Sequence, residues 1–516
     1  MRRSIVALVG LVAAQSLGAQ QTVDLLVRGG TVVDGTGSAA RTADIGIKGD
    51  RIVFVGDAAT SKTTGTRTID ATGFIVAPGF IDPHSHTAGD LSSATQSRRA
   101  NVAYLMQGVT TVVSNNDGGG SVEIGQTLAA WTTQGIGTNG ALFVGHGSVR
   151  GKVMGAAGAQ PTAPQLAAMR AIVVKAMDEG AIGMSTGLYY APGSFSKTDE
   201  VIMLAKIVAQ KGGIYDTHMR DESSYTIGLI ASVHETVRIA REAKIPVHIS
   251  HIKALGVDVW GKADSVIRIV RAARAAGLDV TANQYPYTAS GTGVSAALLP
   301  RWVEEGGNEA MRKRLVDPEL HDQIVTEMTN NMRRRGGAAS LLMTSTRIPG
   351  IIGKNLDQIA KERNADPITT AIDIILKGGS SVASFNMNEK DIRTFMVQDW
   401  VATGSDGSDG HPRKYGTFPK LLRQYVYTDR VLTIEQAVRR SSAMPAAMLR
   451  IKDRGLIANG MFADLIVFDP KTVVDRSTYR EPELLATGMK FVLVNGTVAI
   501  DDGKFNGAMA GRALKR

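Results

Sequence analysis

The sequence predicts an α/β protein: a (β/α)8 TIM-like barrel, a small β-sandwich domain built from both chain ends, and a lid-like insertion before the last barrel strand. Three observations support this class. Residues 76–450 alternate short apolar strands with helical stretches. Both chain ends are instead rich in short strands between glycine turns. The last two barrel strands are too far apart for one connecting helix.

Residues 1–19 have the pattern of a signal peptide. Arg2 and Arg3 form a short positive region, residues 5–14 are apolar, and small side chains allow cleavage after Ala19. The apolar run is too short to span a bilayer as a mature helix, although a short membrane anchor is the alternative. No lipobox cysteine follows. We therefore expect a secreted or periplasmic protein with no membrane contact after signal removal.

Residues 20–75 and 451–516 are expected to form the two halves of the β-sandwich domain. Stretches such as 25–35, 44–56, 463–469 and 491–499 alternate apolar and polar residues between turns. Neither half alone has enough strands for a stable core.

Eight apolar stretches between residues 76 and 450 are expected to form the barrel. They end near residues 81, 113, 146, 187, 218, 251, 283 and 406. The insertion, from about residue 290 to 395, lies on the loop side where barrel active sites are found, and a lid is the natural interpretation.

Composition excludes several chemistries. The chain has no cysteine, which excludes disulfides, thiolate ligands and a cysteine nucleophile. The formal charge is +10, but the positive residues are scattered. The densest run, residues 333–335, lies in a helical-looking segment and is interpreted as a solvated face. We therefore expect no nucleic-acid partner, and the oligomeric state stays open.

Polar residues at the strand ends carry the expected chemistry. His84 and His86 follow an apolar run and have the spacing that places both on one side of a strand. A bare pair of this kind is equally consistent with a polar loop, but other strands also end in polar residues, and imidazole is a common zinc ligand. Strand ends of a barrel converge on one face, so six residues could surround a pair of metal ions: His84, His86, Asp117, His218, His251 and Asp406.

The expected roles follow from the side chains. Asp117 could lie between two cations, and Asp406 could bind one metal and accept a proton from its water, whose pKa falls from about 15.7 toward about 7. His146 also ends a strand and could line the same pocket, or lie outside it.

Eight sequence motifs, which follow one another in the order given, carry a resemblance to a known family. They are residues 78–86 (Pro-Gly-Phe-Ile-Asp-Pro-His-Ser-His), 108–113 (Gly-Val-Thr-Thr-Val-Val), 183–193 (Gly-Met-Ser-Thr-Gly-Leu-Tyr-Tyr-Ala-Pro-Gly), 217–220 (Thr-His-Met-Arg), 250–253 (Ser-His-Ile-Lys), 284–290 (Gln-Tyr-Pro-Tyr-Thr-Ala-Ser), 404–407 (Gly-Ser-Asp-Gly) and 411–419 (His-Pro-Arg-Lys-Tyr-Gly-Thr-Phe-Pro). The series resembles the metal-dependent amidohydrolase superfamily and, within it, the N-acyl-D-amino-acid deacylases (D-aminoacylases). The likeness covers nearly the whole mature chain.

The resemblance implies one or two zinc ions, or another divalent metal. His84 and His86 with Asp406 would hold the weaker position, His218 and His251 the tighter one, and Asp406 would be the general base. Tyr285, Ser290 and Arg413 match positions that bind the substrate's α-carboxylate, with Lys253 and Arg220 nearby.

Asp117 departs from the family pattern. The family usually has cysteine in a Gly-Asn-Cys-Gly phrase after the second strand, and counting from Gly108 places Asp117 at that position. Carboxylate is a harder ligand than thiolate, which leaves the identity of the metal open.

We therefore expect an exported enzyme that hydrolyses the amide bond of N-acyl-D-amino acids to a carboxylic acid and a free D-amino acid. A dipeptidase or cyclic-amide hydrolase of the same superfamily is the nearer alternative. A non-catalytic exported binding protein is the alternative from another class, and the complete ligand set argues against it.

Overall fold

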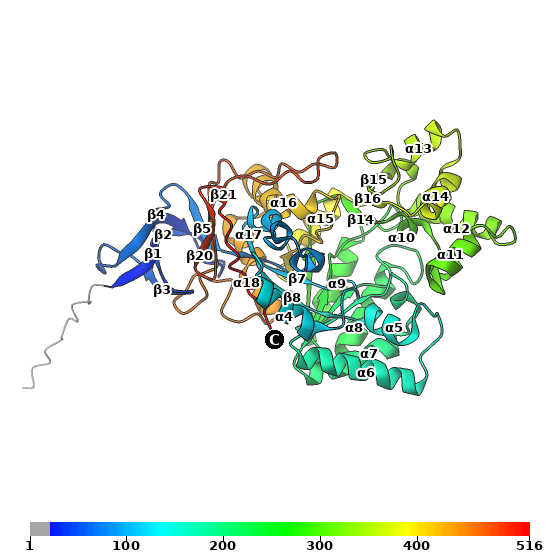
Figure 1. Cartoon of the computed structure of the whole chain (residues 1–516), viewed down its shortest axis with the longest axis horizontal. Helices are drawn as coiled ribbons and strands as arrows, with labels where there is room; N and C mark the ends of the chain where they lie inside the picture. Colours follow the sequence, from blue (N-terminus) through cyan, green and yellow to red (C-terminus); the bar gives the residue numbers. More distant parts are fainter. Residues whose placement is uncertain (1–20) are drawn as a thin grey trace, which may run out of the picture.

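A computed structural model describes residues 21–516, so the predicted signal peptide, residues 1–19, lies outside the described residues. Parallel sheets and helices occupy the middle of the molecule, a large sheet lies at one end and a helical unit at the other (Figure 1). This α/β arrangement with parallel sheets agrees with the predicted class. Within the described range, no helix is both long and apolar enough to cross a bilayer.

Two parallel sheets supply the strands of the middle segment. One has the order β6-β7-β8 and the other β17-β13-β12-β11-β10-β9. Ser85, beyond β6, forms a parallel bridge with Gly407, beyond β17. The strands are β6 Phe80–Asp82, β7 Val109–Ser114, β8 Asn139–Leu142, β9 Val144–Gly145, β10 Gly183–Gly187, β11 Ile214–His218, β12 Val247–Ile249, β13 Val280–Gln284 and β17 Val401–Thr403.

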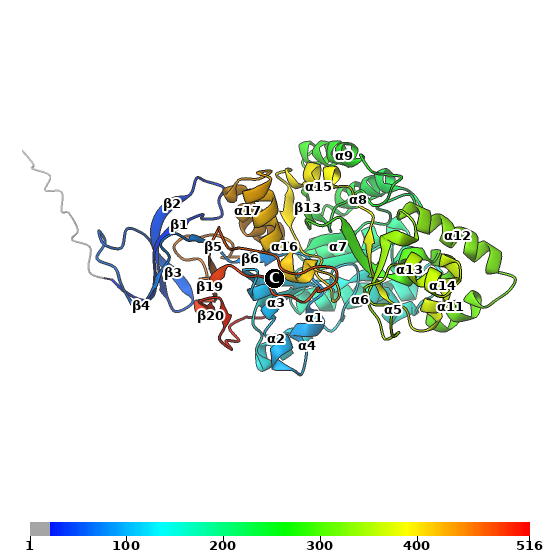
Figure 2. The ribbon, with the colours of Figure 1, turned by 90° about the horizontal axis from the view of Figure 1, so that it is seen from above.

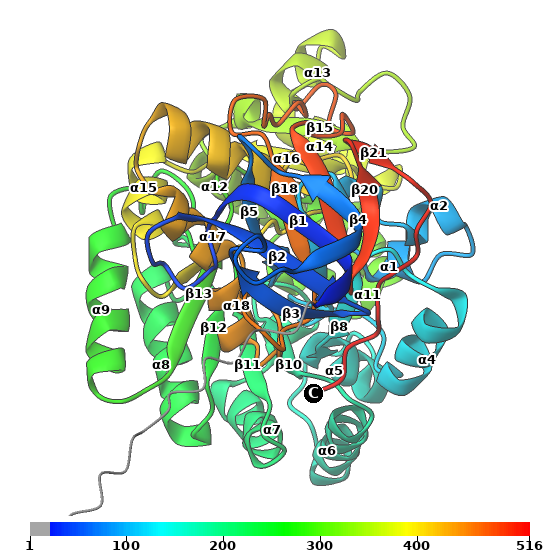
Figure 3. The same ribbon diagram turned by 90° about the vertical axis from the view of Figure 1, so that its left-hand side faces the viewer.

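Helices cover these strands, as Figure 3 shows for α4 to α9. Every residue of β7, β10, β11 and β12 is buried, which is typical of parallel strands beneath helices. In α8, buried Leu229, Val233, Val237 and Ala240 recur at helical spacing and form one apolar face. The helices are α1 Ala88–Leu91, α2 Gln96–Arg99, α3 Val102–Leu105, α4 Ile124–Gln134, α5 His146–Met154, α6 Ala163–Asp178, α7 Thr198–Gln210, α8 Leu229–Ala243, α9 Ala263–Ala275, α15 Glu389–Met396, α16 Arg413–Lys420, α17 Ile434–Ser441 and α18 Ala443–Met448.

Both chain ends contribute to one nine-stranded sheet, of order β21-β20-β19-β18-β5-β1-β2-β3 with β4 paired to β1. The two ends meet where β5 pairs antiparallel with β18, Val76 opposite Val467. The predicted two-layered sandwich stays a prediction. The strands are β1 Thr22–Val32, β2 Arg41–Lys48, β3 Arg51–Gly56, β4 Thr64–Asp70, β5 Ile75–Pro78, β18 Leu465–Phe468, β19 Met489–Val494, β20 Thr497–Asp501 and β21 Lys504–Phe505.

A separate unit lies between β13 and β17, where the sequence predicts an insertion (Figure 2). It contains an antiparallel sheet of order β14-β16-β15 and its own apolar cluster, which includes Met328, Ile359 and Ile374. Its elements are β14 Ala289–Gly293, β15 Leu341–Ser345, β16 Ser381–Phe385, α10 Val294–Leu298, α11 Gly307–Leu315, α12 His321–Arg334, α13 Leu356–Glu362 and α14 Pro367–Leu376.

Candidate metal centre

The ends of five parallel strands bring the predicted ligands together. His218 is the last residue of β11, and His251 follows β12 by two residues. Asp117 and Asp406 each follow a strand by three residues, β7 and β17 respectively. His84 and His86 follow β6 rather than lying on it, but the bridge at Ser85 keeps this segment extended and aims both rings at Asp406.

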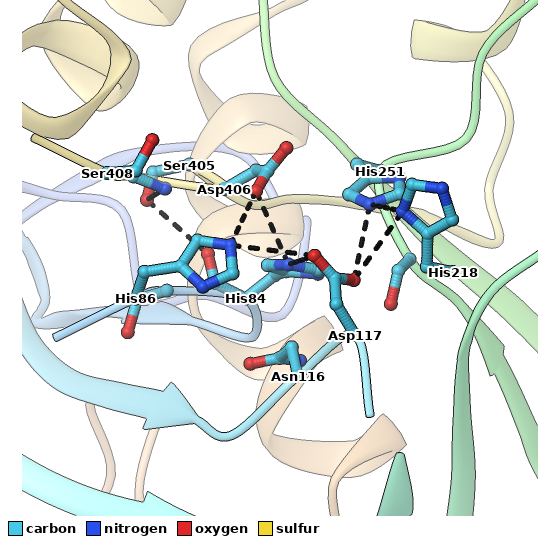
Figure 4. Close-up of polar contacts among 12 residues, drawn as sticks. His84, His86, Asn116, Asp117, His218, His251, Ser405, Asp406 and Ser408 are labelled. Atoms are coloured by element: carbon cyan, nitrogen blue, oxygen red, sulfur yellow. Dashed lines mark hydrogen bonds and ion pairs between the residues drawn. The ribbon is translucent and has the colours of Figure 1, made fainter. Parts of the chain in front are cut away.

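Asp117 lies between two pairs of histidines (Figure 4). Its Oδ2 is 3.5 Å from both His84 Nε2 and His86 Nε2. Its Oδ1 is 3.4 Å from His251 Nε2 and 3.8 Å from His218 Nδ1. The carboxylate therefore faces both pairs at once, the arrangement expected of a ligand shared by two cations.

Asp406 completes one of two candidate ligand groups. Its Oδ1 is 3.0 Å from His86 Nε2 and 3.5 Å from His84 Nε2. The four ligand atoms of His84, His86, Asp117 and Asp406 lie within 4.8 Å of one another, and so do those of Asp117, His218 and His251. The structure thus assembles all six predicted ligands into two groups that share Asp117.

The donor set fits divalent cations. Both ring nitrogens of His84 and Oδ1 of Asp117 are buried without a hydrogen-bond partner. Buried polar atoms normally have partners, so these atoms call for an additional ligand. Mixed imidazole and carboxylate sets suit zinc and similar ions.

The backbone at three of these residues adopts an unusual conformation. Asp117, His251 and Asp406 have φ values of 56°, 35° and 49°, in the left-handed region that non-glycine residues seldom occupy. Such conformations persist where surrounding structure enforces them, and they cluster at functional sites. These three residues therefore have a strained backbone, and this backbone conformation directs their side chains toward the cluster.

The cluster favours ionised carboxylates. Burial disfavours charge on Asp406, but Arg413 and the neighbouring histidines hold its pKa well below the usual range. Burial also opposes a charge on His251, yet Glu222, Asp406 and Asp117 raise its pKa to about 10. Asp406 therefore stays ionised, which is the form in which a carboxylate can bind a divalent cation.

A cavity of about 470 Å³ opens onto the cluster and contains the predicted carboxylate-binding residues Tyr285, Ser290 and Arg413. Nη1 of Arg413 lies 2.7 Å from Asp406 Oδ2, and its Nε is buried without a hydrogen-bond partner. Within residues 21–516, the one hydrogen-bond partner of the Tyr285 hydroxyl is the Met387 sulfur, at 4.0 Å. These donors are available for a substrate carboxylate.

Lys253 lines the cavity but is already paired. Its Nζ donates to Glu222 at 2.7 and 2.9 Å and lies 2.6 Å from His251 Nδ1. Glu222, which sequence reasoning missed, also lies 3.7 Å from His218 Nε2. Together the two residues orient the histidines of one candidate metal position, as outer partners of metal ligands commonly do. The only signal for Glu222 is its place four residues after His218.

Two predicted pocket residues lie elsewhere. Arg220 forms an ion pair with Glu235 at 2.8 Å and lines a neighbouring pocket behind Tyr189 instead. His146 begins α5, is fully buried and contacts Glu200 at 2.8 Å, and it does not line the cavity. In both cases a carboxylate from α7 or α8 draws the side chain away from the strand ends.

Arg335 corrects another expectation. The sequence suggests that residues 333–335 form a solvated face, but Arg335 is buried and lines the cavity. Arg333 does lie at the surface, paired with Asp258 at 2.7 Å. Arg335 keeps helical backbone angles and continues the spacing of the buried face of α12, which Ile324, Met328 and Asn331 form, so its side chain points inward.

Known proteins match nearly the whole chain. Residues 67–500 match the amidohydrolase family. A D-aminoacylase from Alcaligenes xylosoxydans xylosoxydans is 33% identical, covering 96% of this chain and 98% of that protein. An N-acyl-D-glutamate deacylase from the same organism is also 33% identical, covering 92% and 93%. The crystal structure of N-acyl-D-glutamate deacylase from Bordetella bronchiseptica, complexed with zinc and a phosphonate mimic of the tetrahedral intermediate, has a TM-score of 0.82 at 30% identity, covering 96% of this chain and 100% of that one.

Proposed function

The chain belongs to the amidohydrolase family and is an amide-bond hydrolase of the deacylase type, and we propose that it cleaves N-acyl-D-amino acids to a carboxylic acid and a free D-amino acid. One observation carries the proposal. A single cavity joins the two ligand groups to the donors of Tyr285, Ser290 and Arg413, which suit the α-carboxylate of an amino acid.

The metal is part of the proposal. His84, His86 and Asp406 would hold one divalent ion, His218 and His251 the other, with Asp117 shared between them. Zinc is the proposed ion, because the Bordetella relative binds it and the donor set suits it. When bound, such an ion acts as a Lewis acid and lowers the pKa of a coordinated water.

Asp406 is placed to move the proton. Arg413 holds its Oδ2, while Oδ1 faces His84 and His86. The fixed carboxylate accepts a proton from the attacking water and returns it to the leaving nitrogen. Arg413, Tyr285 and Ser290 hold the α-carboxylate of the leaving amino acid and thereby orient the scissile amide.

The finer architecture also belongs to the proposal. The bridge between Ser85 and Gly407, with Asp406 N donating to His84 O at 2.8 Å, supports closure of the parallel strands into one (β/α)8 barrel. Thr344 and Val382 of the insertion line the cavity, which supports a lid. The terminal segments would form the β-sandwich domain.

Export to the periplasm or medium rests on residues 1–19 alone. Expression with the native start, followed by cell fractionation and mass spectrometry, tests it. A mature N-terminus at Gln20 in the exported fraction is the expected result. An intact N-terminus retained in the cytoplasm would remove export from the proposal.

A substrate panel tests the activity. Release of free amine should be measured for N-acetyl-D- and N-acetyl-L-amino acids, dipeptides and cyclic amides. N-acetyl-D-amino acids should be cleaved at least about tenfold faster than their L counterparts, a difference of about 1.4 kcal/mol. Faster cleavage of dipeptides or cyclic amides would replace the proposal with that activity. Full metal content without turnover of any compound would indicate a binding protein.

A further inference from the structure

Arg335 is a buried cation that faces the catalytic cavity without an acidic partner. It is 2% exposed and lines the same cavity as the metal cluster. Among residues 21–516, no aspartate or glutamate forms an ion pair with its guanidinium. The ionisable side chains that lie near the guanidinium are tyrosines. A buried charge without a counter-charge is unfavourable unless something else compensates it.

The partners of Arg335 are all neutral. Nε donates to the Ala297 carbonyl at 3.0 Å, and Nη2 donates to the Tyr189 hydroxyl at 3.3 Å. With its oxygen turned toward the arginine, the Asn386 amide accepts from Nη1 at 3.1 Å. The Tyr225 ring lies 5.7 Å from the guanidinium carbon. These contacts orient the guanidinium and leave its charge uncompensated.

Arg335 differs in this respect from the other lysine and arginine of the cavity. Glu222 neutralises Lys253, and Asp406 neutralises Arg413. Arg440 shows the structural alternative, because it is also buried and donates to the carbonyls of Met396 and Val401. Arg440, however, does not line the cavity, whereas Arg335 does. A purely structural role accounts for Arg440 but leaves the placement of Arg335 unexplained.

Arg335 lies close to the residues that are proposed to bind the substrate and the metal. Asn386 lies between Arg335 and Ser290, and its side chain is 3.0 Å from the Ser290 hydroxyl. Tyr189, the other side-chain partner, has its ring 5.7 Å from that of His218. One side chain, Asn386, therefore separates Arg335 from the α-carboxylate donor Ser290. One side chain, Tyr189, separates it from the candidate metal ligand His218. An anion held there would belong to the same substrate molecule.

We propose that Arg335 binds a second carboxylate of the substrate, so that the enzyme prefers N-acyl-D-amino acids that carry two carboxylates. This inference rests on the proposed function and deepens it. The planar guanidinium matches a carboxylate in two-pronged geometry. The second carboxylate could come from an acidic side chain, as in D-glutamate, or from a dicarboxylic acyl group such as succinyl.

Two matched substrate pairs test the proposal on the unmodified enzyme. N-acetyl-D-glutamate is compared with N-acetyl-D-glutamine, and N-succinyl-D-leucine with N-succinamoyl-D-leucine. Each pair exchanges only a carboxylate for a carboxamide. One pair should show kcat/KM about 10- to 100-fold higher for the acid, and that pair identifies the source of the carboxylate. Ratios below about threefold in both pairs would overturn the proposal.

Variants separate recognition from structure. Arg335→Gln should reduce the acid-to-amide ratio to about one while kcat/KM for the amide stays within about threefold. Arg335→Lys should recover part of the ratio. Arg334→Gln is the matched control, because Arg334 lines the neighbouring pocket rather than this cavity, and its ratio should equal that of wild type.

Equal loss on acid and amide in Arg335→Gln would show a structural role and overturn the proposal. If that variant does not fold, the wild-type ratios decide. Absence of turnover for every N-acyl-D-amino acid would contradict the proposed function instead. The same pairs measured as ligands of the metal-loaded protein by calorimetry would then still test Arg335, since equal affinity within both pairs would exclude it.

Discussion

Asp406 has a fixed position between one guanidinium and two imidazoles, which determines what its substitution should do. Asp406→Asn should lower kcat by at least about 100-fold, because an amide cannot accept the proton. The circular dichroism spectrum should not change. Asp409→Asn is the control, since this carboxylate lies in the same loop but pairs with Lys414. An Asp406→Asn enzyme within a few-fold of wild type would contradict the general-base role.

Asp117 faces both histidine pairs, so its removal should affect both metal positions. We expect metal content and rate to fall together in Asp117→Ala, measured after dialysis against a mild chelator. Asp117→Cys should favour zinc over harder ions such as manganese, because thiolate is softer than carboxylate. Retention of full metal and full rate by the alanine variant would exclude Asp117 from the site.

At the scale of single residues, the sequence predicts best those candidate ligands that lie at the ends of strands. Asp117 and His218 could be found because parallel strands deliver their last residues to one face. Arg335 was missed because a run of three arginines suggests a solvated face, although its helical spacing from buried Met328 and Asn331 places it on the inner face of α12. Arg220 lies outside the cavity because it pairs with Glu235, which comes from a different element, α8.

At the scale of elements, Asp82 joins the ends of β6 and β17. Its Oδ1 accepts from His84 N at 3.1 Å and from Ser405 N at 3.0 Å, and its Oδ2 accepts from the Ser405 hydroxyl. The same carboxyl group therefore positions the two segments that carry His84 and Asp406. A sequence pattern gives the strands but not this cross-link, because the two segments are far apart along the chain.

Asp82→Ala should lower the free energy of unfolding by about 2–4 kcal/mol, because it leaves buried donors without an acceptor. It should also lower activity, since both metal-binding segments lose a common anchor. Asp70→Ala is the control, because Asp70 is exposed and its substitution should cost about 0.5 kcal/mol or less. Equal midpoints of urea unfolding for the two variants would contradict the role of Asp82.

The strand and helix pattern was the most predictable part of the fold. The stretches around β7, β11 and β12 are buried throughout, and apolar residues such as Val112, Ile214 and Val247 recur in them between turn residues, which leaves a clear signal in the sequence. The pairing of β5 with β18 was less accessible, because it joins residues near 76 to residues near 467. Local patterning cannot specify such a distant partner.

At the scale of the whole molecule, a buried polar network links the nine-stranded sheet to the parallel strands. Asp464 pairs with Arg454, and its Oδ1 accepts from Asn495 N at 2.7 Å. Asn495 in turn donates to Asn139, in β8, at 2.8 Å. This ion pair and these hydrogen bonds therefore anchor the terminal segments to the part of the molecule that holds the candidate metal centre.

Asp464→Ala should destabilise the protein by about 3–5 kcal/mol, because it leaves Arg454 as an unpaired buried charge. The kcat of the folded fraction should be unchanged, because Asp464 does not line the catalytic cavity. Thermal unfolding and active-site-normalised kinetics measure the two effects separately. A large loss of kcat without loss of stability would show that the network acts on catalysis instead.

Metal dependence is the central claim, since both ligand groups and the role of Asp406 rest on it. The most direct measurement is the rate on the N-acyl-D-amino acid that the enzyme cleaves fastest, after chelation and during stepwise addition of zinc. The account predicts a rate below about 1% of the original in metal-free protein and recovery with about one or two equivalents. A metal-free protein that keeps its full rate, with the absence of metal confirmed by elemental analysis, would contradict it.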